Sequence, residues 1–232
     1  MRGAALMAGI GLAAAGAAAA QEAAAPTPRP APSLRVGIGV AAASALGTMD
    51  TYYDGARGLS FSLRSGAPHA LRPRGDVDLV NFADATVERP YNGTGPTIAI
   101  TSGAEVLLFG AGAELGHALG RFEGALRAGA GGAYFHTSAA TDSLGTNPNN
   151  QRANTYTTLT WQVQGGATIG FRLGAADVAP RLEVSARVVH AGETKFLREY
   201  NLPVGVISGL YAKPTPYAPT FALLTFGITA RL

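Results

Sequence analysis

The chain has 232 residues, of which 47% are hydrophobic and only 14% are charged, and its formal net charge is +3. This composition is too apolar for a disordered chain and suits one domain of moderate size. The basic residues are spread along the sequence rather than gathered in a run, so nucleic-acid binding is not indicated. Because cysteine is absent, the composition excludes a disulfide framework, a thiolate metal site, a cysteine nucleophile and a lipid-acceptor cysteine.

Residues 1–20 predict a secretory signal peptide that is cleaved from the mature chain. They combine one positive charge at Arg2, a long uncharged stretch, and the alanines at 18–20 as a small-residue cleavage site. Residues 21–33 follow as a proline- and alanine-rich tether that cannot pair in a sheet. The folded domain is therefore expected over residues 34–232.

Strict alternation of apolar with small or polar side chains predicts strands along this domain. In the longest example, Trp161, Ile169 and Phe171 lie on one face, and Gln162 and Arg172 lie on the other. The same pattern occurs at 34–42, 58–64, 103–115, 121–134, 159–173, 181–189 and 221–232, with a weaker candidate at 76–83. The sequence thus predicts about eight strands.

The two faces of these strands indicate which solvent surrounds them. One face is apolar, and the other carries glycine, threonine, glutamine and charge. A soluble sandwich buries its apolar face and uses short strands, whereas strands that cross a bilayer need about 9–11 residues and present apolar side chains outward. Only a closed barrel leaves no backbone group unpaired in lipid. The predicted fold is an all-β, closed, antiparallel transmembrane β-barrel.

The predicted connections alternate in length, as loops and turns do at the two ends of such a barrel. They are long at 192–219 and 136–156 and short at 174–180 and 116–120, although a turn at 66–75 is longer than this rhythm predicts. With eight strands, both ends of the domain lie on the short-turn side, which is the periplasmic side for a translocated chain.

With this leader, these strands and a last strand that carries Phe226, the chain resembles the small OmpA/OmpX-type outer-membrane barrels of Gram-negative bacteria over residues 34–232. That family ends in an aromatic residue that the barrel assembly machinery recognises, whereas this chain ends in Leu232. The family includes structural anchors, adhesins, narrow pores and a few lipid-modifying enzymes. The resemblance therefore implies the bacterial outer membrane more firmly than it implies an activity.

The expected protein is a monomeric, non-enzymatic outer-membrane barrel with a structural, surface-interaction or narrow-pore role. Its expected partners are outer-membrane lipids, lipopolysaccharide and the assembly machinery, without nucleic acid, metal or cofactor. A secreted, soluble ligand-binding β-barrel is the alternative outside the membrane.

Aromatic side chains near the predicted strand ends are expected to form girdles at the lipid headgroups. A ligand-stacking platform is the alternative interpretation. The six residues are Phe122, Tyr134, Tyr156, Trp161, Phe171 and Phe221.

Charged residues on the second face are expected to line the lumen. The arginines near the short-turn end should form a basic collar at the periplasmic mouth; they are Arg35, Arg64, Arg121, Arg172, Arg181 and Arg231. Deeper in the lumen, Arg127 and Arg187 are expected to pair with Glu123 and Glu183. Because an eight-stranded lumen is only wide enough for side chains, these charges should fill it as an ion-pair network; an anion-selective pore is the alternative.

The segment YFHTS resembles the histidine-x-serine of outer-membrane lipid A deacylases, with His136 and Ser138 on one lipid-facing strand face. A serine nucleophile needs a base within reach and a third group that orients the base. The family has an asparagine directly after the serine and a glutamate a dozen residues on, where this chain has Ala139 and Asn150. Residues 124–182 contain no glutamate, so the orienting acid is missing and the hydrolase remains an alternative.

Overall fold

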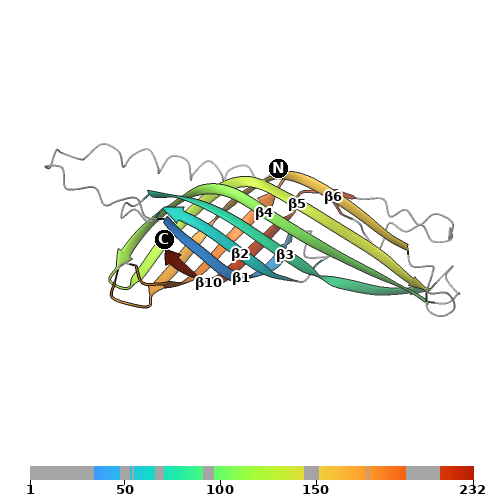
Figure 1. Ribbon diagram of the computed structural model, residues 1–232. Helices are drawn as coiled ribbons and strands as arrows, with labels where there is room; N and C mark the ends of the chain where they lie inside the picture. The colour runs from blue at the N-terminus through green and yellow to red at the C-terminus, as the bar shows by residue number, and fades with distance from the viewer. Residues whose placement is uncertain are drawn as a thin grey trace. The chain divides into compact units, whose positions relative to one another are not determined.

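The computed structural model describes residues 34–47, 53, 55–65, 71–90, 97–143, 152–176, 178–196 and 215–232. In this part of the chain the structure is all-β, and eight strands close into one antiparallel barrel (Figure 1). This confirms the predicted fold class. The predicted leader at 1–20 and tether at 21–33 lie outside the described residues. No helix among the described residues is long and apolar enough to cross a membrane.

Strands that neighbour each other in the sequence are also neighbours in the barrel, and the last strand closes against the first. The barrel strands are β1 Leu34–Leu46, β2 Ala56–Ser65, β3 Leu71–Pro90, β4 Thr97–Leu119, β5 Phe122–Ser143, β6 Arg152–Arg172, β7 Arg181–Ala191 and β10 Thr220–Arg231. Between β7 and β10, the short strands β8 Thr194–Phe196 and β9 Thr215–Tyr217 pair with each other in a separate sheet.

The seam between β1 and β10 depends on glycine. Gly39 and Gly227 lie directly opposite each other, and a Cβ on Gly39 would come within 2.6 Å of the carbonyl oxygen of Phe226. A side chain at this position would push the two strands apart, so glycine permits the close approach that closes the sheet.

The two ends of the barrel differ. We call the end that holds Leu34 and Leu232 the turn end; its connections include the two residues Gly120 and Arg121 between β4 and β5. We call the opposite end the loop end; the connection from β7 to β10 leaves there and includes the β8–β9 pair. This is the polarity that the alternating connection lengths predicted.

Strands β3, β4, β5 and β6 have 20, 23, 22 and 21 residues, whereas the other four barrel strands have 10 to 13. Pairing of β2 with β3 stops at Ala56 and Phe82, but β3 and β4 remain paired as far as Pro90 and Thr97. The register shifts just after Phe82, where β3 leaves the closed barrel, as bulges commonly do at barrel rims. The four long strands therefore continue beyond the loop end as a sheet extension (Figure 1).

Two predicted connections are wrong. The predicted long loop at 136–156 is largely strand, since β5 continues to Ser143 and β6 begins at Arg152. The predicted turn at 66–75 already contains the start of β3 at Leu71. In both places polar or proline residues interrupt the apolar pattern, and pairing with the neighbouring strand nonetheless keeps the backbone extended.

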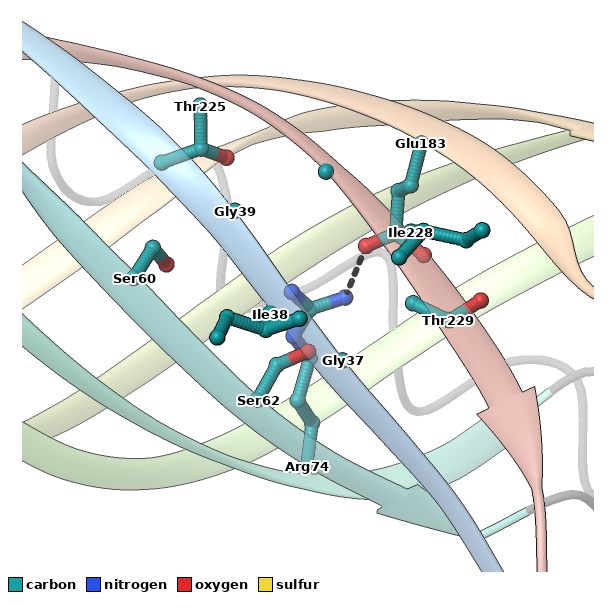
Figure 2. A pocket seen from close by; sticks show the side chains of 11 residues that line it. Gly37, Ile38, Gly39, Ser60, Ser62, Arg74, Glu183, Thr225, Ile228 and Thr229 are labelled. Carbon is teal, nitrogen blue, oxygen red and sulfur yellow. Dashed lines mark hydrogen bonds and ion pairs between the residues drawn. The ribbon is translucent and has the colours of Figure 1, made fainter.

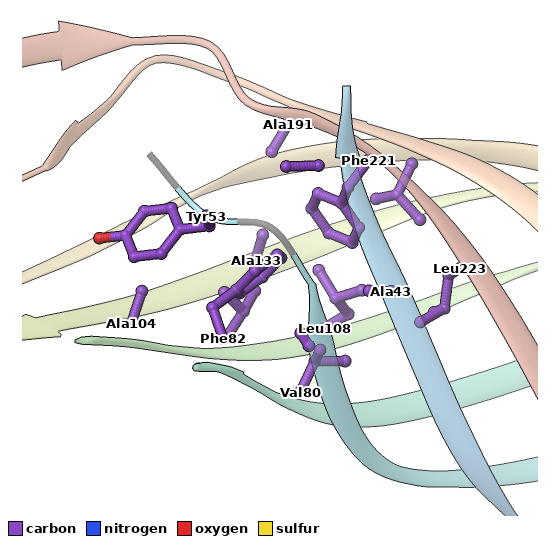
Figure 3. Packing of buried hydrophobic residues seen from close by; sticks show 14 of the residues in the cluster. Ala43, Tyr53, Val80, Phe82, Ala104, Leu108, Ala133, Ala191, Phe221 and Leu223 are labelled. Carbon is purple, nitrogen blue, oxygen red and sulfur yellow. The ribbon is translucent and has the colours of Figure 1, made fainter. Parts of the chain in front are cut away.

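The hydrophobic core lies inside the barrel towards the loop end (Figure 3). Phe82 packs edge-on against Phe221 at 5.9 Å between ring centroids, and Tyr53, from the β1–β2 connection, packs on Phe82 at 5.5 Å. We call this set the apolar plug. Its buried members are Ala41, Ala43, Ala45, Tyr53, Ala56, Val80, Phe82, Ala104, Val106, Leu108, Ala133, Phe135, Val189, Ala191, Phe221 and Leu223.

Candidate functional site: the barrel lumen

The half of the lumen towards the turn end is filled by buried charged side chains. We call this set the ion-pair network. Its members are Arg64, Arg72, Arg74, Arg127, Arg181, Arg187, Asp76, Asp78, Glu114, Glu123 and Glu183. They come from β2, β3, β4, β5 and β7, so the network joins opposite walls of the barrel.

Arg74 is the centre of the network. Its Nη1 lies 2.8 Å from Oε1 of Glu183 and 3.2 Å from Oε2 of Glu114, and its Nε lies 2.9 Å from Oδ1 of Asp76. Glu183 and Asp76 stand on different strands far apart in sequence, and one guanidinium connects them. Such fork-shaped pairing uses the fixed donors of arginine.

Glu114 is shared by three arginines. Besides Arg74, it forms ion pairs with Arg64 at 3.2 Å and with Arg72 at 3.0 Å, and its side chain is fully buried. Arg72 also contacts Glu123, which in turn contacts Arg181. A buried carboxylate is expensive unless charged donors surround it, and this arrangement supplies them.

The loop-end border of the network is formed by two further arginines. Arg127 contacts Asp76 and donates to Ser185 Oγ at 3.2 Å. Arg187 lies 2.5 Å from Asp78 and donates to Gln164 at 2.6 Å. The next inward-facing residues on β3 and β7, two positions on from Asp78 and Arg187, already belong to the apolar plug.

Glycines leave a small cavity beside the network (Figure 2). Its volume is about 20 Å³, and its lining includes Gly37, Gly39 and the Arg74–Glu183 pair. The hydroxyls of Ser60, Ser62, Thr225 and Thr229 also line it. This polar space suits about one water molecule.

The outside of the barrel has the opposite chemistry from the charged half of its lumen. Alternate residues of every barrel strand point outward, and most of the large ones are apolar and exposed. They include Val36, Ile38, Val40, Leu59, Phe61, Leu63, Val77, Leu79, Phe109, Leu126, Trp161, Ile169, Val184, Val188, Leu224, Phe226 and Ile228. In water such a continuous apolar surface would aggregate, whereas in a bilayer it is the required surface.

In a closed sheet every backbone group is hydrogen-bonded to a neighbouring strand, so the sheet can stand in lipid. Its apolar outer face and charged interior are both in favourable surroundings only when a membrane surrounds the barrel. The protein is an eight-stranded transmembrane β-barrel. Its location is the bacterial outer membrane, where barrels of this architecture reside. The turn end, which holds both ends of the barrel, is then the periplasmic end.

No protein-family model matches the sequence, and no curated protein matches it. Among solved structures, the barrel is similar to Ail, the attachment invasion locus protein of Yersinia pestis, with 11% identity, a TM-score of 0.48, and coverage of 87% of this chain and 99% of that one.

It is also similar to a major outer membrane protein from Thermus thermophilus, with 13% identity, a TM-score of 0.48, and coverage of 86% and 99%. The outer membrane protease OmpT from Escherichia coli matches with 7% identity, a TM-score of 0.42, and coverage of 91% and 99%. These likenesses are distant, and the barrel's own inner and outer surfaces identify it.

The structure places five of the six arginines of the predicted basic collar inside the barrel or near its turn end. Arg35, Arg64 and Arg181 are buried inside the barrel, and Arg172 and Arg231 are half-buried near the turn end. Arg121 was wrongly placed, because it lies exposed in the turn after Gly120, whose φ of 62° makes the tight reversal. Carboxylates engage Arg64 and Arg181, so these two do not present free charge at the mouth.

The predicted pairing inside the lumen was also wrong. Among the described residues, neither Arg127 nor Arg187 forms an ion pair with Glu123 or Glu183, although all four side chains are buried in the lumen. The two arginines do reach across the lumen, but the acids that they meet stand on β3. The acids that pair with Arg127 and Arg187 are Asp76 and Asp78.

Sequence reasoning missed the β3 contribution to the network, and with it Glu114 on β4. Arg72, Arg74, Asp76 and Asp78 occupy every second position of β3 and all point inward. This charge alternation was the available signal. It was hidden because Pro73 and Gly75 occupy the outward positions between them, so the apolar half of the pattern is lacking.

The six predicted girdle residues divide into two groups. Phe122, Tyr134 and Trp161 are outward-facing and exposed, and Phe171 packs beside Phe122 at 5.0 Å between ring centroids. Two placements were wrong because of strand parity. Phe221 is fully buried in the apolar plug, and Tyr156 lies on the face opposite to Trp161, half-buried, with Lys195 Nζ 5.9 Å from its ring centroid.

His136 and Ser138 lie on the outward face of β5, where it continues towards the sheet extension. The register places the exposed Glu105 of β4 directly opposite His136, an acid that sequence reasoning did not consider. Among the described residues, however, no hydrogen bond or ion pair joins His136 to Glu105 or to Ser138. The three residue types share a surface without forming a connected triad.

Proposed function

We propose that the barrel is closed and non-enzymatic, and that its role is structural or lies in surface interaction at the loop end. The carrying observation is that the lumen is occupied at two successive levels, by the ion-pair network and then by the apolar plug (Figures 2 and 3). Ions would have to break buried ion pairs and then cross tightly packed phenyl rings, which disfavours the narrow-pore role.

Single-channel recording tests the closed barrel directly. The wild-type protein in a planar bilayer is expected to be silent. Phe82→Ala combined with Phe221→Ala removes one of the two barriers by emptying the middle of the apolar plug, so rare, brief openings through the remaining ion-pair network should appear. A matched control is Phe226→Ala, which removes an outward-facing ring from the same strand as Phe221. Steady wild-type channels of porin size would contradict the closed lumen.

The proposed partners are outer-membrane lipids and lipopolysaccharide around the apolar outer face, and the barrel assembly machinery at the last strand. β10 presents Leu224, Phe226 and Ile228 outward, which supports recognition of an apolar strand face. Phe226→Ala should slow insertion by reconstituted assembly machinery more than Leu224→Ala does. We also propose a monomer without nucleic-acid partners; native mass spectrometry of the folded protein should show a single chain.

The register supports one second candidate, a lipid-modifying hydrolase that uses Ser138 with His136 and Glu105. Because these side chains are not connected by hydrogen bonds, we place it second. Lipid A mass from cells that express wild-type protein or Ser138→Ala distinguishes the two roles, with Thr155→Ala on the adjacent strand as the control. A lipid A acyl loss that depends on Ser138 would establish the hydrolase, and identical spectra would remove it.

A further inference from the structure

A groove of about 710 Å³ lies on the outer wall of the barrel, over β1 to β5. Part of its floor is a row of small residues in direct register, Gly75 on β3, Ala111 on β4 and Ala130 on β5. Gly75 also lies opposite Leu63 on β2, and Val36 continues the same row on β1. The outer surface of the barrel is therefore recessed along this row on β3, β4 and β5, and it protrudes at the branched side chains of β1 and β2.

Large side chains border this floor directly on its loop-end side and follow two rows away on its turn-end side. Towards the loop end, Phe61, Val77 and Phe109 form one row across β2, β3 and β4. The Phe109 ring covers Gly132 on β5, directly opposite. Towards the turn end the next row is again small, and beyond it leucines follow on β3, β4 and β5; they are Leu71, Leu115 and Leu126. The floor is thus a trough between two apolar ridges.

Among the described residues, the lining offers carbon and no free polar group. Ser62 and Asp76 contribute to the groove, but alternation turns their side chains into the lumen, where Asp76 pairs with Arg74 and Arg127. Their backbone groups belong to paired strands. The described lining therefore favours a hydrocarbon ligand, because none of these residues offers a charged or hydrogen-bonding group.

We propose that this groove binds the acyl chains of one bilayer lipid and holds them longer than the surrounding lipids are held. The inference rests on the proposed function as a membrane barrel, because the groove lies within the apolar outer face. An empty trough in hydrocarbon would leave its walls without dispersion contacts on one side. The convex outer wall of a second barrel cannot reach the floor of the groove, whereas a flexible lipid acyl chain can.

Native mass spectrometry measures such retention. The protein is reconstituted in dioleoylphosphatidylcholine vesicles, extracted into detergent and analysed intact. The wild type should carry one phospholipid. Ala111→Phe with Ala130→Phe fills the floor and should lower the lipid-bound fraction by about tenfold, through loss of a few methylene contacts. Ala186→Phe, an exposed outward position on β7, is the matched control and should leave the fraction unchanged.

Trp161 gives a second readout that requires no substitution. It is the single tryptophan of the chain, and it lies opposite Gly132, next to the row that holds Ala130. Protein loaded in phosphatidylcholine with brominated acyl chains is diluted into an excess of unbrominated vesicles. Exchange of the surrounding lipids restores most of the fluorescence, and a retained lipid should leave a quenched fraction that decays more slowly.

Different results would overturn the lipid-binding groove and the proposed membrane barrel. A wild-type protein that requires detergent and is folded, yet carries no lipid and recovers its fluorescence in one fast phase, overturns the groove and leaves the membrane barrel intact. A second protein chain bound in place of lipid also overturns it. A mature chain that is soluble without detergent overturns both proposals.

Discussion

Inside one barrel, the turn-end half of the lumen is filled by charge and the loop-end half by carbon. In the ion-pair network, Arg74 pairs with Asp76, Glu114 and Glu183 at once, whereas in the apolar plug Phe82 and Phe221 are each one of many contacts. A buried ion keeps its full desolvation cost when its partner is removed, but a buried ring loses energy in proportion to its contacts. One lumen therefore contains an all-or-none region and a graded one.

The largest effect is expected from Arg74→Met, which keeps much of the side-chain volume and removes the charge. Asp76, Glu114 and Glu183 each lose one of their arginine partners at once and keep another, so the free energy of unfolding should fall by about 3 kcal/mol, the lower end of the range for a broken buried pair. Denaturant titration of the folded barrel in lipid vesicles measures this. If Arg74→Met lowered the free energy of unfolding by less than any single substitution in the apolar plug does, the all-or-none description of the network would be contradicted.

In the apolar plug, Phe221→Ala should lower the free energy of unfolding by about 3 kcal/mol. The ring is fully buried and stacks edge-on with Phe82, and the closed wall around it cannot collapse into the space. The same titration applies. Val189→Ala, a smaller truncation in the same plug, should cost less, and an equal cost would show that the plug is not graded.

Substitutions can shift the boundary between the ion-pair network and the apolar plug. Arg187 and Asp78 pair beside the plug, and both side chains are almost fully buried. Replacing both with apolar residues, Arg187→Met and Asp78→Leu, should cost no more than about 1 kcal/mol and can raise stability, because no unpaired ion remains. Arg187→Met alone should be clearly worse. A double variant less stable than that single variant would refute this reasoning.

The smallest effect is expected at an arginine outside both halves. Arg121 is exposed in the turn between β4 and β5, and Arg121→Ala should change the free energy of unfolding by no more than about 0.5 kcal/mol. It also serves as the charge-matched control for Arg74→Met. A loss as large as that of Arg74→Met would mean that total positive charge, rather than the network, stabilises the lumen.

The sequence by itself determined the strands, their inner and outer faces and the membrane as solvent. Alternation has a period of two residues, which is a local property, so Trp161 and Gln162 could be assigned to opposite faces without knowledge of their neighbours. Parity alone also would have placed Phe221 inward, on the face of Thr225 and Thr229, and the error there came from weighing its aromatic ring above its position.

The tertiary structure decided which side chains meet in the lumen and where the strands end. Arg74 and Glu183 stand 109 positions apart, and their contact depends on the register of every strand between them and on closure of β10 against β1. The length of β3 to β6 likewise follows from pairing with each neighbour rather than from their own polar sequences. The face of the sheet on which a side chain lies depends on a few neighbouring residues. A contact across a closed barrel depends on the geometry of the whole sheet.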